Sequence, residues 1–441
     1  MTGIRKRNMT AALLAALLAA GSLPCPGSEA MFEYAPLVRL PKYYNLAEQG
    51  KKPAVRSQGE LGTCWAISAC SAIESALLPD QEFLFSPDHM SLANGYDSAQ
   101  EDGGDYYMIM SYLADWKGPV YESEDPYGDG VSPEGLTASA HVGDIRFMRG
   151  MPQQRIKQMI LTYGAAQSSL SMDRTRTDGE EYHYYNEMTS AYYDPFVEEL
   201  NHDILILGWD DGYPAENFRI RPRRDGAWIC QNTWGEDFGE DGIFYVSYED
   251  RNLLRKGGLV YSDIHAAEEG EKVYEQDSLG WLGRQGYGGE ECWFAGVFEA
   301  ERAEEITGVG FYTTGPYTAF RILLIPEYEE PEDLVQAASG TDGRILAAGQ
   351  IADPGFHTVS VPGEVNLREG QRYAVVIWVN TPGESKPVAV EVEKDRYTKS
   401  VTTEGRETWL SRTGTGWENT QKAYGTNVCM KVFTKKNERG I

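Results

Sequence analysis

The chain has 441 residues and a formal net charge of −27 at pH 7. This length exceeds that of one ordinary compact domain, so two domains are expected. Apolar residues make up 41% of the chain and aromatic residues 12%, which is enough for packed cores and excludes a disordered protein. The acidic balance, without any basic stripe, argues against nucleic acid as a partner.

The N-terminus has the pattern of a signal peptide. A basic stretch, Arg5–Arg7, precedes the short apolar run Ala11–Ala20. This run is too short to anchor a chain in a bilayer, so we predict that residues 1–30 are removed and that the protein is secreted, to the cell envelope or beyond. No later stretch reaches transmembrane length, and no transmembrane anchor is expected. A lipoprotein attached through Cys25 is the weaker alternative, because Pro24 stands where a small residue is wanted.

The cysteine count points weakly in the same direction. Removal of the leader would leave five of the six cysteines. An odd number in an exported protein suggests one free, reactive thiol, although fully reduced core cysteines would give the same count. Whether Cys292 pairs with Cys429 stays open at this point.

Helical patterns come first along the chain and strand patterns follow. The predicted elements are helices at 64–78, 106–116 and 152–163, and strands at 165–170, 204–209, 227–230 and 243–248. This segregation is typical of an α+β domain with a helical lobe, a β lobe and a cleft between them. We assign residues 31–265 to this domain.

A second domain is predicted behind a charged, polar linker at 266–272. From 273 to 441, Gly and Pro turns separate short alternating runs at fairly even spacing. These runs are 292–298, 306–313, 320–326, 356–361, 372–378, 388–392 and 428–433. The pattern predicts an antiparallel β-sandwich.

One cysteine stands where a thiol nucleophile would be expected. Cys64 begins a helical pattern directly after a loop that contains glycine. The helix dipole would favour the negative charge of a thiolate, which is the reactive form of cysteine. Hydrolysis by a thiol also needs a histidine, a group that orients the imidazole, and donors for the oxyanion. The backbone N–H of Cys64 is one candidate donor, and the side-chain amide of Gln58 is the second.

Three segments resemble the signatures of papain-like cysteine peptidases, the C1 family. Gln58–Ala66 is similar to the nucleophile segment, Asn201–Trp209 to the histidine segment and Gln231–Gly235 to the asparagine segment. His202 follows Cys64 by 138 residues, within the roughly 130–150 residues expected of this arrangement.

The resemblance extends over about Leu40–Asp263 and implies roles for the matching residues. Cys64 would be the nucleophile and His202 the base. Asn232 would orient the imidazole, and Trp234 would shield the hydrogen bond between the two from water.

The same resemblance implies substrate-binding residues near the nucleophile. Gly103 and Gly104 match the backbone wall along which such enzymes pair with an extended peptide. Trp65 directly follows the nucleophile, and Asp203 stands near the specificity pocket. Asp203 would either favour a basic side chain in the substrate or alter the pH profile.

The chain departs from the family pattern in the nucleophile loop and in front of the domain. Leu61 stands where the family often has a cysteine, so the disulfide that would brace this loop is missing. Thr63 is larger than the usual residue beside the nucleophile and would crowd the site. The short distance from the leader to Leu40 leaves no room for a long inhibitory propeptide.

The C-terminal part also carries a resemblance. The segments 292–298 and 306–313 resemble the lectin-like domain that follows the catalytic domain in some bacterial papain-like peptidases. A glycan or another cell-surface ligand is one expectation for this domain, with exposed Trp281, Trp409 or Trp417 stacking on sugars. Packing of these tryptophans in the core or in turns is the alternative.

These features together predict a secreted cysteine endopeptidase that hydrolyses protein or peptide substrates through an acyl-enzyme. No cofactor and no metal ion are expected. Two alternatives stay open: a degenerate peptidase scaffold that acts as a binding protein or adhesin, and a transamidase that uses the same residues.

Overall fold

The computed structural model describes residues 39–173, 176–177, 181–339 and 344–437. The predicted signal peptide and Cys25 lie outside this part of the chain. From Leu40 onward the chain belongs to one compact unit, which contains both domains described below.

The described part of the N-terminal domain has four α-helices. They are α1 (Cys64–Leu77), α2 (Pro87–Leu92), α3 (Tyr106–Ala114) and α4 (Gln153–Tyr163). All residues from Trp65 to Ser75 in α1 are buried, because its many small side chains let neighbouring elements approach on every side. The Asp105 carboxylate caps α3 by accepting the N–H groups of Tyr107 and Met108. The helices α1, α3 and α4 confirm the three helices predicted from sequence, whereas α2 was not predicted.

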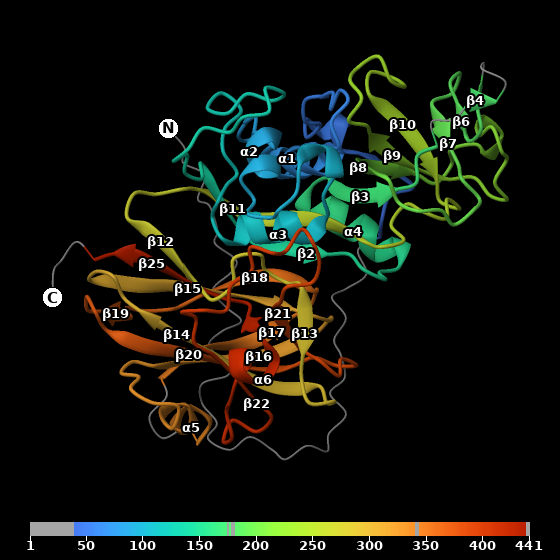
Figure 1. Cartoon of the computed structure of the whole chain (residues 1–441). Coiled ribbons are helices and arrows are strands. Elements are labelled where there is room, and N and C mark those ends of the chain that lie inside the picture. The colour runs from blue at the N-terminus through green and yellow to red at the C-terminus, as the bar shows by residue number, and fades with distance from the viewer. Residues whose placement is uncertain (1–38, 174–175, 178–180, 340–343, 438–441) are drawn as a thin grey trace, which may run out of the picture. The chain divides into compact units, whose positions relative to one another are not determined.

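Strand β8 (His202–Asp210) lies at the centre of the β lobe (Figure 1). It pairs antiparallel with β3 (Ala166–Leu170) on one side and with β9 (Ala227–Gln231) on the other. β10 (Ile243–Ser247) extends the sheet beyond β9. Because all of β8 except its last residue is buried, it appears in the sequence as a continuous apolar run.

Short strands complete the N-terminal domain. They are β1 (Tyr43–Asn45), β4 (Arg176–Thr177), β5 (Glu181–Tyr182), β6 (Tyr185–Asn186) and β7 (Ala191–Tyr192). β1 pairs with the far end of β8, and β7 pairs with β10.

Strand β2 (Ala140–Phe147), which was not predicted, joins the two domains. It pairs antiparallel with β11 (Gly258–Ala266) of its own domain and with β18 (Gly355–Ser360) of the C-terminal domain. The β-ladder therefore continues across the domain boundary. The connection at the predicted linker 266–272 is only four residues long, since β11 ends at Ala266 and β12 begins at Glu271.

The C-terminal domain consists of two antiparallel sheets (Figure 1). One contains β12 (Glu271–Glu275), β13 (Gly283–Gln285), β15 (Glu304–Thr313), β18, β19 (Asn366–Leu367), β21 (Val388–Glu391), β24 (Asn427–Val428) and β25 (Met430–Lys436). The other contains β17 (Arg344–Ile351), β16 (Thr318–Ile325), β20 (Arg372–Asn380), β14 (Glu291–Glu299), β22 (Thr408–Ser411) and β23 (Glu418–Asn419). The short helices are α5 (Asp333–Ser339) and α6 (Thr420–Tyr424).

A shared apolar core confirms the predicted sandwich. Side chains of the six-stranded sheet, such as Phe294 and Ile377, pack in one buried cluster with Val309 and Val432 of the other sheet. The alternation of strand residues places every second side chain in this core.

A buried cation holds the two domains together. Lys431 of β25 is fully buried and contacts Asp115, at the C-terminal end of α3, and Asp277, whose carboxylate lies 2.9 Å from the ammonium group. Beside this cluster, Trp116 stacks on Phe433 with ring centroids 4.6 Å apart. A buried charge is tolerated only when it is paired, so the two carboxylates are required at this junction.

The described cysteines are all free thiols, so Cys292 and Cys429 do not pair. Four of these five cysteines are buried, and Cys64 alone among them is partly exposed. Among the helices of the described residues, none is both long and apolar enough to cross a membrane.

Candidate active site

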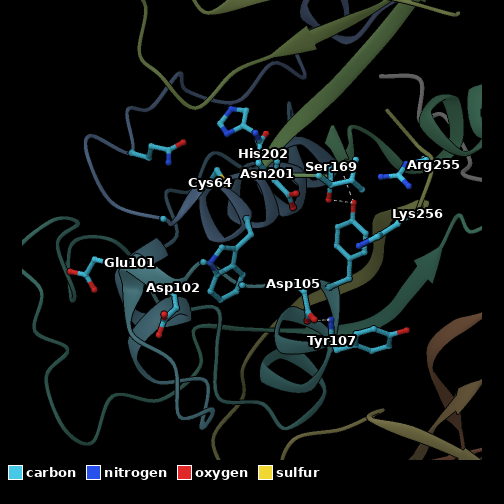
Figure 2. Close-up of a pocket in the computed structure, with 18 of the residues that line it drawn as sticks. Cys64, Glu101, Asp102, Asp105, Tyr107, Ser169, Asn201, His202, Arg255 and Lys256 are labelled. Atoms are coloured by element: carbon cyan, nitrogen blue, oxygen red, sulfur yellow. Dashed lines mark hydrogen bonds between the residues drawn. The ribbon is translucent and has the colours of Figure 1, made fainter. Parts of the chain in front are cut away.

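Cys64 lies at the first position of α1 and at the edge of a cavity of about 610 Å³ (Figure 2). The loop that precedes it turns back tightly, and Thr63 forms the N-cap. The helix therefore directs its partial positive charge toward the thiol. The same cavity is lined by Gln58, Gly103 and His202.

His202 and Asn232 meet because their strands pair. His202 is the first residue of β8, and Asn232 directly follows β9, whose last residue Gln231 stands opposite Leu205. The Nε2 atom of His202 lies 2.6 Å from Oδ1 of Asn232. Since an amide oxygen only accepts, Nε2–H is the donor, and Nδ1 is the nitrogen that can take up a proton.

The hydrogen bond between these two side chains is buried. His202 is 6% exposed and Asn232 is 1% exposed. The indole of Trp234 lies against the imidazole, with ring centroids 4.7 Å apart. The N–H of Thr233 also donates to Oδ1 of Asn232 at 2.8 Å, which fixes the amide orientation.

Backbone donors point at the sulfur from two sides. The N–H groups of Trp65 and of Cys64 itself lower the pKa of the thiol, and so does the N–H of Asp203, the residue after His202. Burial has the opposite and larger effect: with a smaller contribution from the Asp203 carboxylate, it raises the pKa of Cys64 to about 12. A thiolate here therefore needs a positive charge nearby, and a protonated imidazole of His202, which lines the same cavity, is one source of it.

Gln58 connects the loop before Cys64 to the β lobe. Its side-chain oxygen accepts a hydrogen bond from the hydroxyl of Thr233 at 2.7 Å, and its amide nitrogen donates to the carbonyl of Leu61 at 2.7 Å. Because the amide nitrogen carries two N–H groups, one remains for a ligand in the cavity.

Gly104 is the point of closest approach between the cavity wall and α1. A Cβ atom at this position would lie 2.2 Å from the indole ring of Trp65, so no larger residue fits. The preceding Gly103 has φ 80°, a left-handed conformation that favours glycine. The two glycines thus let the wall run directly beside α1, and Gly103, Gly104 and Trp65 all line the cavity.

Asp203 lines the cavity but is only 7% exposed. Its Oδ2 atom accepts a hydrogen bond from the amide of Gln167 at 2.7 Å, and burial raises the pKa of its carboxyl group. The hydroxyl of Tyr106, another lining residue, contacts Ser169 at 2.7 Å close by.

The sequence-based account missed the contacts of Tyr127. Its hydroxyl donates to the carbonyl of Gln58 at 3.0 Å and also forms a hydrogen bond with the hydroxyl of Thr63. Thr63 was expected to crowd the site, but its side chain is fully buried and turned toward Tyr127. Only tertiary contact links Tyr127 to the loop, so no local pattern in the sequence could reveal it.

Two family models match the chain. Residues 40–259 match the papain family cysteine protease model, and residues 273–434 match the lectin like domain model. Together the matches cover both domains of the fold.

Curated relatives match the first of these regions. Procathepsin L of Rattus norvegicus is 26% identical over 229 residues, which are 50% of this chain and 64% of the rat protein. Procathepsin L of Felis catus is 27% identical over 227 residues, 49% of this chain and 63% of the cat protein. Cysteine proteinase 1 of Zea mays is 25% identical over 249 residues, which are 52% of this chain and 63% of the maize protein. The chain thus spans somewhat less than two thirds of these relatives.

Two solved structures share the fold of both domains. The clostridial cysteine protease Cwp84, after propeptide cleavage, superposes with a TM-score of 0.78 and 22% identity, covering 90% of this chain and 99% of that one. A second structure holds the protease and lectin-like domains of Cwp84, described as a surface layer associated protein of Clostridium difficile. It superposes with a TM-score of 0.77 and 23% identity, covering 91% of this chain and 90% of that one. At these identities the likeness concerns the fold.

The two family models, which match residues 40–259 and 273–434, identify the families. The chain is a papain-family cysteine peptidase domain followed by a lectin-like domain.

Proposed function

We propose that the protein is a secreted endopeptidase that hydrolyses peptide bonds of proteins or peptides through an acyl-enzyme on Cys64. His202 acts as the base, Asn232 orients the imidazole, and the N–H of Cys64 together with the amide of Gln58 holds the oxyanion. The observation that carries this proposal is the 2.6 Å contact between His202 and Asn232, in a cavity that the cysteine at the tip of α1 also lines.

The proposed reaction has two halves. Sγ of Cys64 transfers its proton to Nδ1 of His202 and attacks the carbonyl carbon, whose oxygen becomes anionic between the two donors. His202 then gives the proton to the leaving amine, the C–N bond breaks and a thioester forms. A water molecule then attacks the thioester while Nδ1 of His202 takes its proton. The C–S bond breaks, the acid is released, and His202 returns the proton to the sulfur.

The surrounding residues fit supporting roles. Trp234 covers the hydrogen bond between His202 and Asn232, which protects it from competition with water. The backbone of Gly104 pairs with an extended peptide like a strand, and Gly103, whose N–H donates to the carbonyl of Gln100 at 3.4 Å, sets the course of this wall.

Removal of the sulfur provides the direct test. We expect Cys64→Ala to lower kcat for peptide hydrolysis by at least about three orders of magnitude, because no other group in the cavity can form the thioester. The thermal unfolding midpoint should change little, since Cys64 is partly exposed. Hydrolysis of fluorogenic peptides and thermal unfolding of both proteins measure the two effects.

Labelling with an epoxide-type thiol inhibitor separates the alternatives. The wild type and the control Cys292→Ala, which removes a buried thiol of the C-terminal domain, should both be labelled at Cys64. A binding protein or adhesin would show neither selective labelling nor hydrolysis. A transamidase would be labelled, but with added amines it would yield ligated rather than hydrolysed products.

Tyr127 is proposed to brace the nucleophile loop in place of the missing disulfide. Its hydroxyl bridges the carbonyl of Gln58 and the hydroxyl of Thr63, at the two ends of the loop that leads to Cys64. Asp88, which is fully buried, holds the Tyr127 turn by accepting the N–H of Gly128 at 2.8 Å. Tyr127 does not line the cavity, so it would act as a positioning residue through Gln58 and Cys64.

We expect Tyr127→Phe to lower kcat by about three- to tenfold with little change in KM, because the variant loses one or two hydrogen bonds that hold the loop before Cys64. Thr63→Val should have a similar effect, Thr63→Ser should retain activity, and the Thr63→Val/Tyr127→Phe double variant should be little worse than either single one. Steady-state kinetics of the four variants provide the measurement. Equal loss of activity in Thr63→Ser would contradict the brace.

Secretion is the second part of the proposal, and it rests on the leader pattern in residues 1–30. The described surface-layer association of the structurally similar Cwp84 favours it. Expression in a bacterial host should give protein in the medium or cell envelope whose first residue lies near Met31, as determined by N-terminal sequencing. A chain recovered only inside the cell and still starting at Met1 would refute it.

We also propose that the lectin-like domain binds a glycan through the outer face of its six-stranded sheet. Trp293 of β14 stands directly opposite Trp378 of β20, and Trp409 of β22 stands opposite Ala295, two residues along from Trp293. These three tryptophans therefore share one face, and each is partly exposed. Trp293, Trp409 and Trp417 also pack against a small buried cluster on this face, as the packing alternative expected of the last two, so only their exposed edges would reach a sugar. Trp281, expected to be exposed, is instead 4% exposed and packs in the core.

Truncation of this face tests glycan binding. We expect Trp293→Ala and Trp378→Ala to weaken binding to isolated bacterial cell-wall polysaccharide about tenfold, because tryptophans dominate such contacts. Ile345→Ala is the matched control, since Ile345 is 62% exposed and belongs to the same sheet without being aromatic. Binding that is absent in the wild type, or unchanged in both tryptophan variants, would contradict the assignment.

A further inference from the structure

Three cations line one end of the cavity that contains Cys64. They are Arg149, Arg255 and Lys256, and all three are exposed. Figure 2 shows Arg255 and Lys256 beside Ser169, on the opposite side of the site from Glu101 and Asp102. In a chain with a net charge of −27, a group of cations in the cleft runs against the overall balance.

Two adjoining turns bring these cations together. Arg149 follows β2, whereas Arg255 and Lys256 precede β11, the antiparallel partner of β2. Between them, Gly257 has φ 95°, and a Cβ atom there would lie 2.9 Å from the backbone N and Cα of Arg149. The two turns therefore touch, and the absence of a side chain at Gly257 permits their contact.

The charges of these cations are not neutralised within the described part of the chain. No described carboxylate lies within the 4.0 Å of an ion pair from Arg149, Arg255 or Lys256. The guanidinium of Arg255 donates instead to the backbone carbonyl of Glu198 at 2.6 Å. This contact positions the group and leaves its charge in place.

The carboxylates of the cavity are mostly held away from this end. Figure 2 shows Glu101 and Asp102 on the opposite side of the site, and Asp102 forms an ion pair with Arg396 at 3.0 Å. The Asp203 carboxylate is turned to Gln167, and that of Asp105 to the first turn of α3. The end that carries Arg149, Arg255 and Lys256 is therefore the more positive end of the cleft for a bound peptide.

The floor at this end is aromatic. Tyr107 and Phe147 line the cavity with ring centroids 6.5 Å apart, and Tyr106 lies beside Phe147 at 5.7 Å. Such a floor accepts the methylene groups of a side chain whose charged end reaches the rim.

We propose that this end of the cleft is a substrate subsite for an acidic side chain, held by Arg149, Arg255 and Lys256. Tyr106 follows Gly104 closely along the chain, so the residue bound there lies on the part of the peptide that pairs with the Gly103–Gly104 wall. The subsite rests on the proposed peptidase function, whose substrate class it narrows. The expected preference for an acidic substrate side chain is the opposite of the basic preference that the sequence suggested for Asp203.

The test uses thiol-reactive peptidyl epoxides that differ at one residue. Each position along the peptide is occupied in turn by Glu, Gln or Lys, and the rate of inactivation of Cys64 in the full-length protein is measured. At one position we expect the Glu compound to react about tenfold faster than the Lys compound, with Gln between them. The difference should shrink in 0.5 M salt, because exposed charges are screened.

Charge reversal provides the decisive variant. In Arg255→Glu/Lys256→Glu the order at that position should invert, whereas the control Arg412→Glu, an exposed cation of the C-terminal domain, should keep the wild-type order. Selective labelling with equal rates for Glu and Lys, or an order unchanged in the double variant, would overturn the subsite while leaving the peptidase intact. Absence of any labelling at Cys64 would instead overturn the proposed function itself.

Discussion

The register of β8 on β9 is the constraint on which the site depends. His202 begins one strand and Asn232 follows the other, so the pairing of Leu205 with Gln231 brings the two side chains to 2.6 Å. A slip by one residue would turn the imidazole to the opposite face of the sheet. An irregularity in the ladder between Ile206 and Gly208 marks this register, and Gly208 must face β1, because a Cβ atom there would lie 2.0 Å from the carbonyl oxygen of Tyr44.

The cysteine reaches this pair from the other lobe, and contacts across the cleft hold it there. The N–H of Gln58 donates to the carbonyl of Thr233 at 2.8 Å, and the side chains of the same two residues are hydrogen bonded. Thr233 in turn fixes Asn232 through its own N–H. One short segment after β9 therefore sets both the orientation of the imidazole and the position of the loop before Cys64.

The second domain contributes to the cleft without lining it. Arg396 forms an ion pair with Asp102, and the carbonyl of Tyr397 accepts the N–H of Asp97 at 2.9 Å. Ser400 donates to the carboxylate of Asp97 and to the carbonyl of Gly95, both at 2.9 Å. These contacts tie the C-terminal domain to the segment that leads into the Gly103–Gly104 wall. Together with the buried Lys431 cluster, they make the lectin-like domain part of the framework that holds this wall.

The sequence predicted those features that a continuous run of residues encodes, and it missed those that depend on contacts between distant parts of the chain. α1 and β8 were predicted because a single run of small or apolar residues encodes each of them, and the motifs around Cys64, His202 and Asn232 have fixed spacing. β2 was missed because its charged residues find partners only in the fold: Asp144 lies 2.9 Å from His357 of the other domain. The cationic end of the cleft was missed for the same reason, since Arg149 and Lys256 lie more than a hundred residues apart in the chain. These cations come together only once β2 and β11 have paired. The substrate preference that they would impose is therefore harder to predict from sequence than the residues around Cys64.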